Sequence, residues 1–130
     1  MTPAQATRPP SVLVVDDDPF SCELLQEMLL TLGITDVTVA GNGQEALRHL
    51  NDGATPDYLI SDLYMPDMDG IDLINSLTTL PYRGGLILLS GVDVEMLSLA
   101  RQIAQDQGLQ VLGAVMKPLR LDQPSALLGL

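Results

Sequence analysis

Residues 11–20, Ser-Val-Leu-Val-Val-Asp-Asp-Asp-Pro-Phe, constrain the fold more than any other stretch of the chain. Residues 12–15 are apolar at every position and mostly β-branched, which favours a strand buried on both faces of a parallel sheet. Asp16, Asp17 and Asp18 follow this strand directly. Adjacent carboxylates repel one another, so a fold places three of them at a strand end only where a cation offsets their charge. The sequence therefore predicts a parallel sheet with a cation-binding edge.

A helix is predicted to begin immediately after the carboxylates. Pro19 cannot donate a backbone hydrogen bond but fits the first turn of a helix, so Asp18 is predicted to be the N-cap and Pro19 the first helical residue. Gly33 is predicted to end this helix. Cys22 falls inside it, and as the only cysteine of the chain it is predicted to be a small buried thiol.

Apolar runs and helical patterns alternate along the rest of the chain. Amphipathic spacing predicts three further helices, each lying between two apolar runs. This alternation predicts an α/β fold with a doubly wound parallel sheet and helices on both faces. The four apolar runs that predict the further strands are residues 37–40, 58–60, 86–89 and 111–115.

The composition of the chain limits the kinds of partner that it is expected to bind. The chain has 130 residues, of which 46% are hydrophobic, and its formal net charge is −11. Like charges repel, so such a chain is not expected to bind nucleic acid or an anionic membrane directly. No secretory signal and no apolar run of ~20 residues is found, which predicts a cytoplasmic protein. Residues 1–10, with three prolines, are predicted to be a flexible N-terminal lead, and residues 11–130 a single domain.

Polar side chains follow the other predicted strands as well. Asp62 comes just after the third apolar run, Ser90 after the fourth, and Lys117, the only lysine, after the fifth. In doubly wound sheets ligands bind at the carboxyl ends of the strands, so these groups are expected to meet the three carboxylates there. Carboxylates, a hydroxyl and an ammonium together suit Mg²⁺ and a phosphate-like group.

Four motifs, taken in order along the chain, resemble those of one protein family. They are Val-Val-Asp-Asp-Asp-Pro at 14–19, Ser-Asp-Leu-Tyr-Met-Pro-Asp-Met-Asp-Gly at 61–70, Leu-Leu-Ser-Gly at 88–91 and Lys-Pro at 117–118. The chain resembles the receiver domain of bacterial two-component response regulators, which has a flavodoxin-like fold with strand order 2-1-3-4-5. The resemblance implies a signalling domain that accepts a phosphoryl group from a phosphohistidine and then changes conformation. The implied donor is a sensor histidine kinase or a histidine phosphotransfer protein.

The resemblance also implies a metal site at the strand ends. Asp62 is the implied phosphoacceptor. Asp17 and Asp62 are implied to bind Mg²⁺ directly, together with the backbone carbonyl of Tyr64. Asp16 is implied to hold a metal-bound water, so the implied metal site consists of Asp16, Asp17, Asp62 and Tyr64.

The family pattern extends to the switch hydroxyl and the lysine. Ser90 stands at the position of the hydroxyl that closes on the phosphoryl group, and Lys117 at that of the lysine that binds a phosphoryl oxygen. The Lys117–Pro118 bond is expected to be cis. Tyr64 and Val92 flank the implied path of water and offer no acid or amide to orient it, which predicts at most slow autophosphatase activity.

Two features depart from the family pattern. Ala114 stands three residues before the lysine, where the family usually has an aromatic residue, so the usual coupling of Ser90 to a ring is not expected. Twelve residues follow Pro118, and we expect the chain to belong to a longer protein with a C-terminal output domain. Residues 108–113 resemble receivers joined to cyclic-di-GMP phosphodiesterase domains, which makes such a domain one candidate. A homodimer is also left open.

A Mg²⁺-dependent aspartyl-phosphate phosphohydrolase is the alternative function from another class. Such an enzyme also uses an aspartate nucleophile at a strand end. It needs a second acid two residues after the nucleophile, and Tyr64 occupies that position here. The sequence therefore favours the signalling domain.

Overall fold

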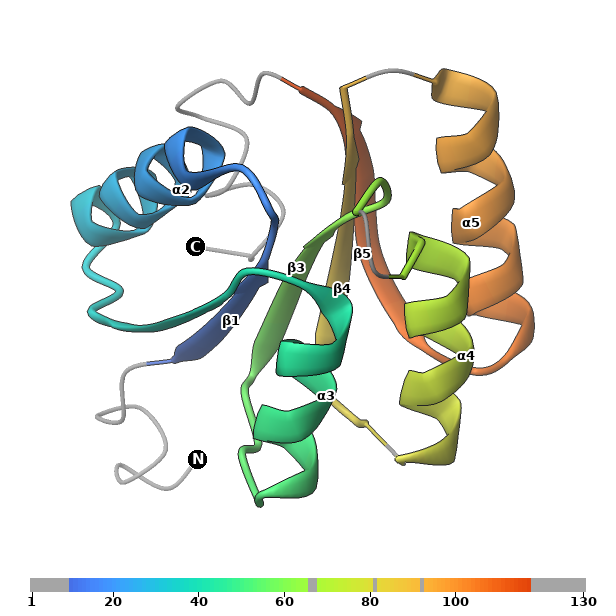
Figure 1. Cartoon of the computed structure of the whole chain (residues 1–130), viewed down its shortest axis with the longest axis horizontal. Helices are drawn as coiled ribbons and strands as arrows, with labels where there is room; N and C mark the ends of the chain where they lie inside the picture. The colour runs from blue at the N-terminus through green and yellow to red at the C-terminus, as the bar shows by residue number, and fades with distance from the viewer. Residues whose placement is uncertain (1–9, 66–67, 81, 92, 118–130) are drawn as a thin grey trace, which may run out of the picture.

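Five parallel strands form one sheet in the order β2-β1-β3-β4-β5, which confirms the predicted fold class (Figure 1). The computed structural model describes residues 10–65, 68–80, 82–91 and 93–117. The strands are β1 (Ser11–Val15), β2 (Asp36–Ala40), β3 (Tyr58–Asp62), β4 (Gly85–Ser90) and β5 (Gln110–Met116), and the helices are α2 (Pro19–Thr31), α3 (Gly43–Asn51), α4 (Gly70–Thr79) and α5 (Val94–Asp106).

Each predicted apolar run is a strand, and the strands extend one or two residues beyond some of the runs. The central strand β1 pairs with β2 on one side and β3 on the other, with Val15 opposite Ala40 and Ser61. All the pairings are parallel, so the carboxyl ends of the five strands lie along one edge of the sheet. This edge is called the carboxyl edge below.

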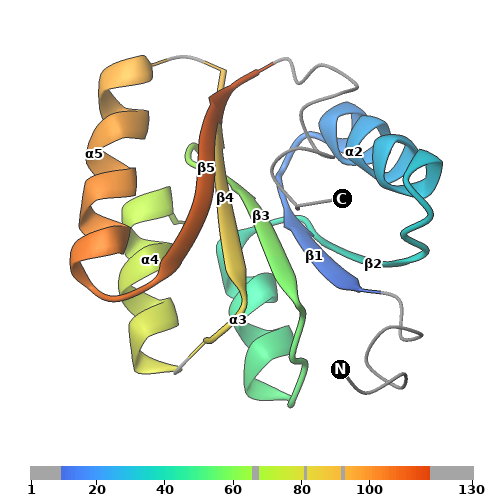
Figure 2. The same ribbon diagram turned by 180° about the vertical axis from the view of Figure 1, so that it is seen from behind.

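Alternate residues of β1 face the two sides of the sheet. Leu13 and Val15 pack in one apolar cluster with side chains of α3, α4 and α5, whereas Val12 and Val14 pack in a second cluster with side chains of α2. Figures 1 and 2 show the same division, with α2 on one side of the sheet and the other three described helices on the opposite side. Burial on both faces accounts for a strand that is apolar at every position.

The predicted boundaries of the first helix are confirmed. Asp18 is its N-cap, and its carboxylate accepts a hydrogen bond from the Phe20 N–H at 3.1 Å. Pro19 occupies the first helical position. Gly33 follows the C-cap with φ of 85°, a left-handed conformation that glycine adopts without strain.

The helices are short. The longest described ones, α2 and α5, have 13 residues each. Across the described parts of the chain, no helix combines the length and the apolar character that crossing a membrane requires.

Some predictions fall on residues outside the described part of the chain. They concern all of the N-terminal lead except Pro10, the water-flanking Val92, the expected cis bond at Pro118, and the segment 119–130.

Two neighbouring leucines of α2 test which face of the helix carries stability. Leu29 is 0% exposed, whereas Leu30 is 60% exposed. We expect Leu29→Ala to lower the free energy of unfolding by about 2–5 kcal/mol, because it removes buried methyl groups and leaves a cavity. Leu30→Ala should stay within about 0.5 kcal/mol of the wild type. Urea unfolding followed by circular dichroism measures both, and equal losses would contradict the assignment of the buried face.

Candidate functional site

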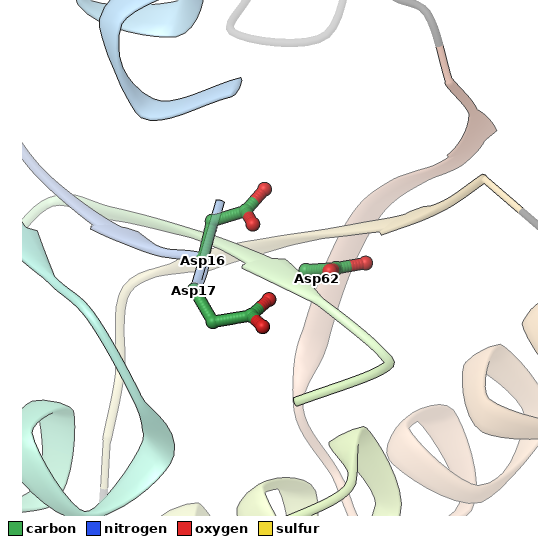
Figure 3. Close-up of side chains that lie close together, drawn as sticks. All are labelled: Asp16, Asp17 and Asp62. Atoms are coloured by element: carbon green, nitrogen blue, oxygen red, sulfur yellow. The ribbon is translucent and has the colours of Figure 1, made fainter. Parts of the chain in front are cut away.

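Three carboxylates meet at the carboxyl edge. Asp16 and Asp17 follow the last residue of β1, and Asp62 is the last residue of β3 (Figure 3). Each side chain offers an oxygen, and these oxygens lie within 4.8 Å of one another. The pairing of β1 with β3 brings them together, since Val15 and Ser61 are direct partners in the register.

Lys117 reaches the same place from β5. Its backbone N–H donates to the Ser90 carbonyl at 2.8 Å, which places the residue beside the end of β4. Its Nζ lies 2.7 Å from Asp16 Oδ2 and 3.5 Å from Asp62 Oδ2. The ammonium therefore lies beside the carboxylates from two different strands.

The two buried carboxylates differ in how well they are hydrogen-bonded. Asp16 is 1% exposed, and its second oxygen accepts a 2.9 Å hydrogen bond from the Asp18 N–H. Both of its oxygens therefore have a donor. Asp62 is 7% exposed and has the longer contact with Lys117. The backbone N–H of Tyr64 lies near enough to the Asp62 carboxylate to lower its pKa slightly.

Burial and neighbouring charges shift the acidity of the site. Burial raises the pKa of Asp62, the ammonium of Lys117 opposes that effect, and the charge of Asp16 adds to it, with a raised pKa as the outcome. Burial by itself lowers the pKa of Lys117, but the hydrogen bond to Asp16 and the charges of Asp62 and Asp16 outweigh it and raise the pKa. Lys117 is therefore a cation throughout the physiological range.

Ser90 lies at the same edge and is fully buried. Its Oγ accepts a hydrogen bond from the Asp93 N–H at 3.3 Å. Asp93 is the N-cap of α5, so the hydroxyl joins the end of β4 to the start of that helix. The predicted site residues Asp16, Asp17, Asp62, Ser90 and Lys117 thus all lie on one edge of the sheet.

Tyr64 and Ala114 have different surroundings. The Tyr64 side chain is 39% exposed, just beyond the end of β3. Ala114 pairs with Leu88 in the sheet and packs, partly buried, against the apolar cluster under α3, α4 and α5. Its single methyl group leaves no ring at this position to follow a movement of Ser90.

The side chains fit a magnesium ion. Mg²⁺ prefers oxygen ligands and takes one or two carboxylates together with water and phosphate oxygens. The three clustered carboxylates supply such oxygens, and Asp17 is exposed, which leaves room for water at its side. Asp16 and Asp62 are nearly buried, so a bound cation also reduces the cost of two charges in a low-dielectric place.

Two residues beside the cluster belong to α2. Cys22 is buried as predicted, and its Sγ–H donates to the Asp16 carbonyl at 3.3 Å. Burial and the charge of Asp16 raise the pKa of the thiol.

Ser21 was not predicted to belong to the site, although its Oγ lies 3.4 Å from Lys117 Nζ and 3.1 Å from Asp18 Oδ2. Ser21 follows the N-cap by three residues, and this spacing could have predicted its contact with Asp18.

A comparison with known protein families decides the class of the chain. The family model of the response regulator receiver domain matches residues 12–123, which include every residue of the site. The chain belongs to the response regulator receiver domains. Receiver domains are the phosphoacceptor domains of two-component signalling, so the predicted class of function is confirmed, and the phosphohydrolase alternative is not favoured.

Individual relatives of this receiver domain agree with the family match. It is 30% identical over 114 residues to a probable C4-dicarboxylate response regulator, DctR, of Bacillus subtilis (strain 168). That match covers 86% of this chain and 47% of the relative, so the chain spans about half the length of that regulator. A crystal structure of a response regulator from Colwellia psychrerythraea is 31% identical, covers 94% of this chain and 95% of that one, and gives a TM-score of 0.78.

A third comparison concerns the fold alone. The receiver domain of the sensor histidine kinase PA1611 from Pseudomonas aeruginosa PAO1 was solved with a magnesium ion coordinated in its active-site cleft. It is 21% identical to this receiver domain, with a TM-score of 0.76 over 93% of this chain and 95% of that one.

The acidity of Asp62 gives a testable dependence of stability on pH. Its pKa is raised on folding from an ordinary value of 3.8, so the ionised carboxylate costs stability once the pH exceeds the unfolded pKa. Without metal, Asp62→Asn should therefore raise the free energy of unfolding near neutral pH. The gain should shrink as the pH falls and disappear below 3.8, where Asp62 is protonated in both states.

Urea unfolding in EDTA across this pH range measures the difference. Asp52→Asn serves as the control, because Asp52 is exposed at the end of α3. A variant Asp62→Asn that is less stable than the wild type near neutral pH would show that the Lys117 contact outweighs burial.

Proposed function

We propose that Asp62 is the phosphoacceptor of this receiver domain and that Asp16, Asp17 and Lys117 assist it. The observation that supports the proposal is the position of its carboxylate: buried at the end of β3, within 4.8 Å of two further carboxylates and 3.5 Å from an ammonium. Asp16 is engaged at both oxygens, and Asp17 is exposed. Asp62 is therefore the buried carboxylate with the weaker engagement and the best candidate nucleophile.

The proposed reaction transfers one phosphoryl group. A carboxylate oxygen of Asp62 attacks the phosphorus of a phosphohistidine, an O–P bond forms, and the P–N bond breaks. The bonding electrons remain with the imidazole nitrogen, which takes up a proton as the histidine leaves. The product is an acyl phosphate on Asp62.

Positive charge at the site is proposed to assist this transfer. A carboxylate and a phosphoryl group repel each other because both are negative, and the Lys117 ammonium offsets that repulsion. Mg²⁺ bound by Asp17, Asp62 and the carbonyl of Tyr64, with Asp16 holding a bound water, would supply further positive charge at the phosphoryl oxygens. Asp16 keeps Lys117 at the edge through its 2.7 Å contact.

The proposed signal leaves the site through Ser90. Its hydroxyl would turn to donate to a phosphoryl oxygen, and its hydrogen bond from the Asp93 N–H would weaken in consequence. Ala114 provides no ring to report this movement, so the start of α5 is the proposed route.

The partners follow from the family in outline. Receiver domains work with histidine kinases or histidine phosphotransfer proteins, and we propose one of these as the donor in the cytoplasm. A C-terminal output domain is proposed for the whole protein, with a cyclic-di-GMP phosphodiesterase as one candidate and a homodimer as a candidate assembly. The net charge of −11 argues against direct contact of this domain with nucleic acid.

Intact mass spectrometry tests the phosphoacceptor directly. With phosphoramidate and Mg²⁺, the wild type should gain about 80 Da, one phosphoryl group. Asp62→Asn should abolish the gain, because an amide is not a nucleophile, and EDTA should suppress it in the wild type.

Asp69→Asn is the matched control for that experiment. Asp69 caps α4, and asparagine is an equally good N-cap, so this variant should be phosphorylated like the wild type. A phosphoryl adduct that persists in Asp62→Asn would refute the assignment.

The lifetime of the acyl phosphate tests the proposed slow autophosphatase activity. Tyr64 places a half-exposed ring just beyond Asp62, where we expect it to hinder the approach of water. Tyr64→Asn should shorten the lifetime several-fold, because an amide is smaller and can orient a water. The decay of the adduct after removal of the donor measures this, and an unchanged half-life would mean that Tyr64 does not limit the rate.

A further inference from the structure

The Lys117 ammonium lies near three oxygen atoms, which belong to the segment after β1, to α2 and to β3. Asp16 Oδ2 lies 2.7 Å from Nζ, Ser21 Oγ 3.4 Å and Asp62 Oδ2 3.5 Å. An ammonium has three N–H donors, so each oxygen can take one. Ser21 is the only member of this set that carries no charge, and it has no part in the function proposed above.

The direction of the Ser21 hydroxyl is set by the N-cap of α2. The hydroxyl has one hydrogen, and its oxygen lies 3.1 Å from Asp18 Oδ2, a carboxylate that can only accept. Ser21 therefore donates to Asp18, and its lone pairs remain to accept from Lys117. The ammonium has no lone pair, so Ser21 cannot donate a hydrogen bond to Lys117.

The N-cap itself is held in place by the backbone. The other carboxylate oxygen of Asp18 accepts a hydrogen bond from the Phe20 N–H at 3.1 Å. The backbone N–H of Asp18 donates to Asp16 Oδ1. The carboxylate of Asp18 thus joins the helix start to Ser21, and Ser21 joins it to the lysine. Lys117 is 20% exposed, so water competes little for the same N–H.

We propose that Ser21 is a positioning residue for Lys117. With Asp16, it holds two of the three N–H groups of the ammonium and directs the third towards Asp62 and an incoming phosphoryl oxygen. The proposal rests on the function proposed for Lys117. Asp18, predicted to be only a helix cap, acts in it as the group that polarises the Ser21 hydroxyl.

The consequence concerns the rate of phosphoryl transfer. A lysine side chain has several rotatable bonds, and an ammonium held by Asp16 alone can rotate about that contact. Ser21 reduces this freedom before the donor arrives, and such preorganisation lowers the barrier of a reaction that develops negative charge. Removal of the hydroxyl should leave the fold intact, because Ser21 lies in the first turn of α2.

Three variants of α2 test the proposal. Ser21→Ala should lower the rate of phosphorylation by phosphoramidate at saturating Mg²⁺ by roughly tenfold, which corresponds to the lower end of the range for one hydrogen bond to a charged group. Ser21→Thr keeps the hydroxyl and should restore most of the rate. Thr31→Ala is the control, since Thr31 donates only to the Glu27 carbonyl at the far end of the same helix, and it should behave like the wild type.

Nuclear magnetic resonance adds a readout that does not depend on phosphorylation. Lys117 is the only lysine, so protein grown with ¹⁵N-lysine shows a single side-chain ammonium signal. In the unphosphorylated protein, Ser21→Ala should shift that signal and speed the exchange of its protons with water. Ser21→Thr and Thr31→Ala should leave it close to the wild-type position.

The outcomes separate this proposal from the one on which it rests. A wild type that takes up no phosphoryl group on Asp62 would overturn the proposed function, while the ammonium signal would still report the Ser21 contact. An unchanged rate together with an unchanged ammonium signal in Ser21→Ala would overturn the positioning role. A loss of rate that Ser21→Thr does not restore, at an unchanged melting temperature, would also overturn it.

Discussion

The contact of one partly buried ammonium with two buried carboxylates determines the electrostatics of the whole site. Lys117 lies 2.7 Å from Asp16 and 3.5 Å from Asp62, and without it two nearly buried carboxylates would face each other. The contact is unequal. Asp16 is hydrogen-bonded at both oxygens and anchors the lysine, whereas Asp62 keeps a longer contact and a raised pKa. The ionised carboxylate of Asp62 therefore lowers the stability of the fold, but it remains available to react.

The parallel sheet places the starts of the four described helices at the carboxyl edge, near this charge. The helices α2, α4 and α5 begin at the carboxyl edge with aspartate N-caps, and α3 begins there with an asparagine. Carboxylates suit these positions because helix N-termini carry partial positive charge. The acidic N-caps make the carboxyl edge negatively charged. The parallel arrangement of the strands therefore gathers carboxylates that can bind a cation at this edge.

Two hydroxyl groups connect the carboxyl edge to helix starts. Ser90 joins the end of β4 to the N-cap of α5, and Ser21 joins Lys117 to the N-cap of α2. Each hydroxyl links an N-cap to the carboxyl edge, and under the two proposals above a change of charge at Asp62 would be coupled to the first turns of two helices. Ala114 provides no ring on β5, so the proposals assign this coupling to the starts of α2 and α5.

The sequence by itself determined the fold class, the strand order through the family resemblance, and the N-cap at Asp18. Local rules suffice for the buried strand and for the helix start, because an unbroken apolar run, a capping aspartate and a proline each act over a few residues. It also placed Asp16, Asp17, Asp62, Ser90 and Lys117 at one edge, since parallel strands end together. Only the tertiary structure decided how the five share their contacts. That Lys117 lies nearer to Asp16 than to Asp62, and that Ser21 completes its surroundings, depends on side chains 101 and 96 residues apart along the chain. The physical reason is that distances between such residues are set by the packing of α2 on the sheet and by the pairing of β5 within it, which no local pattern encodes.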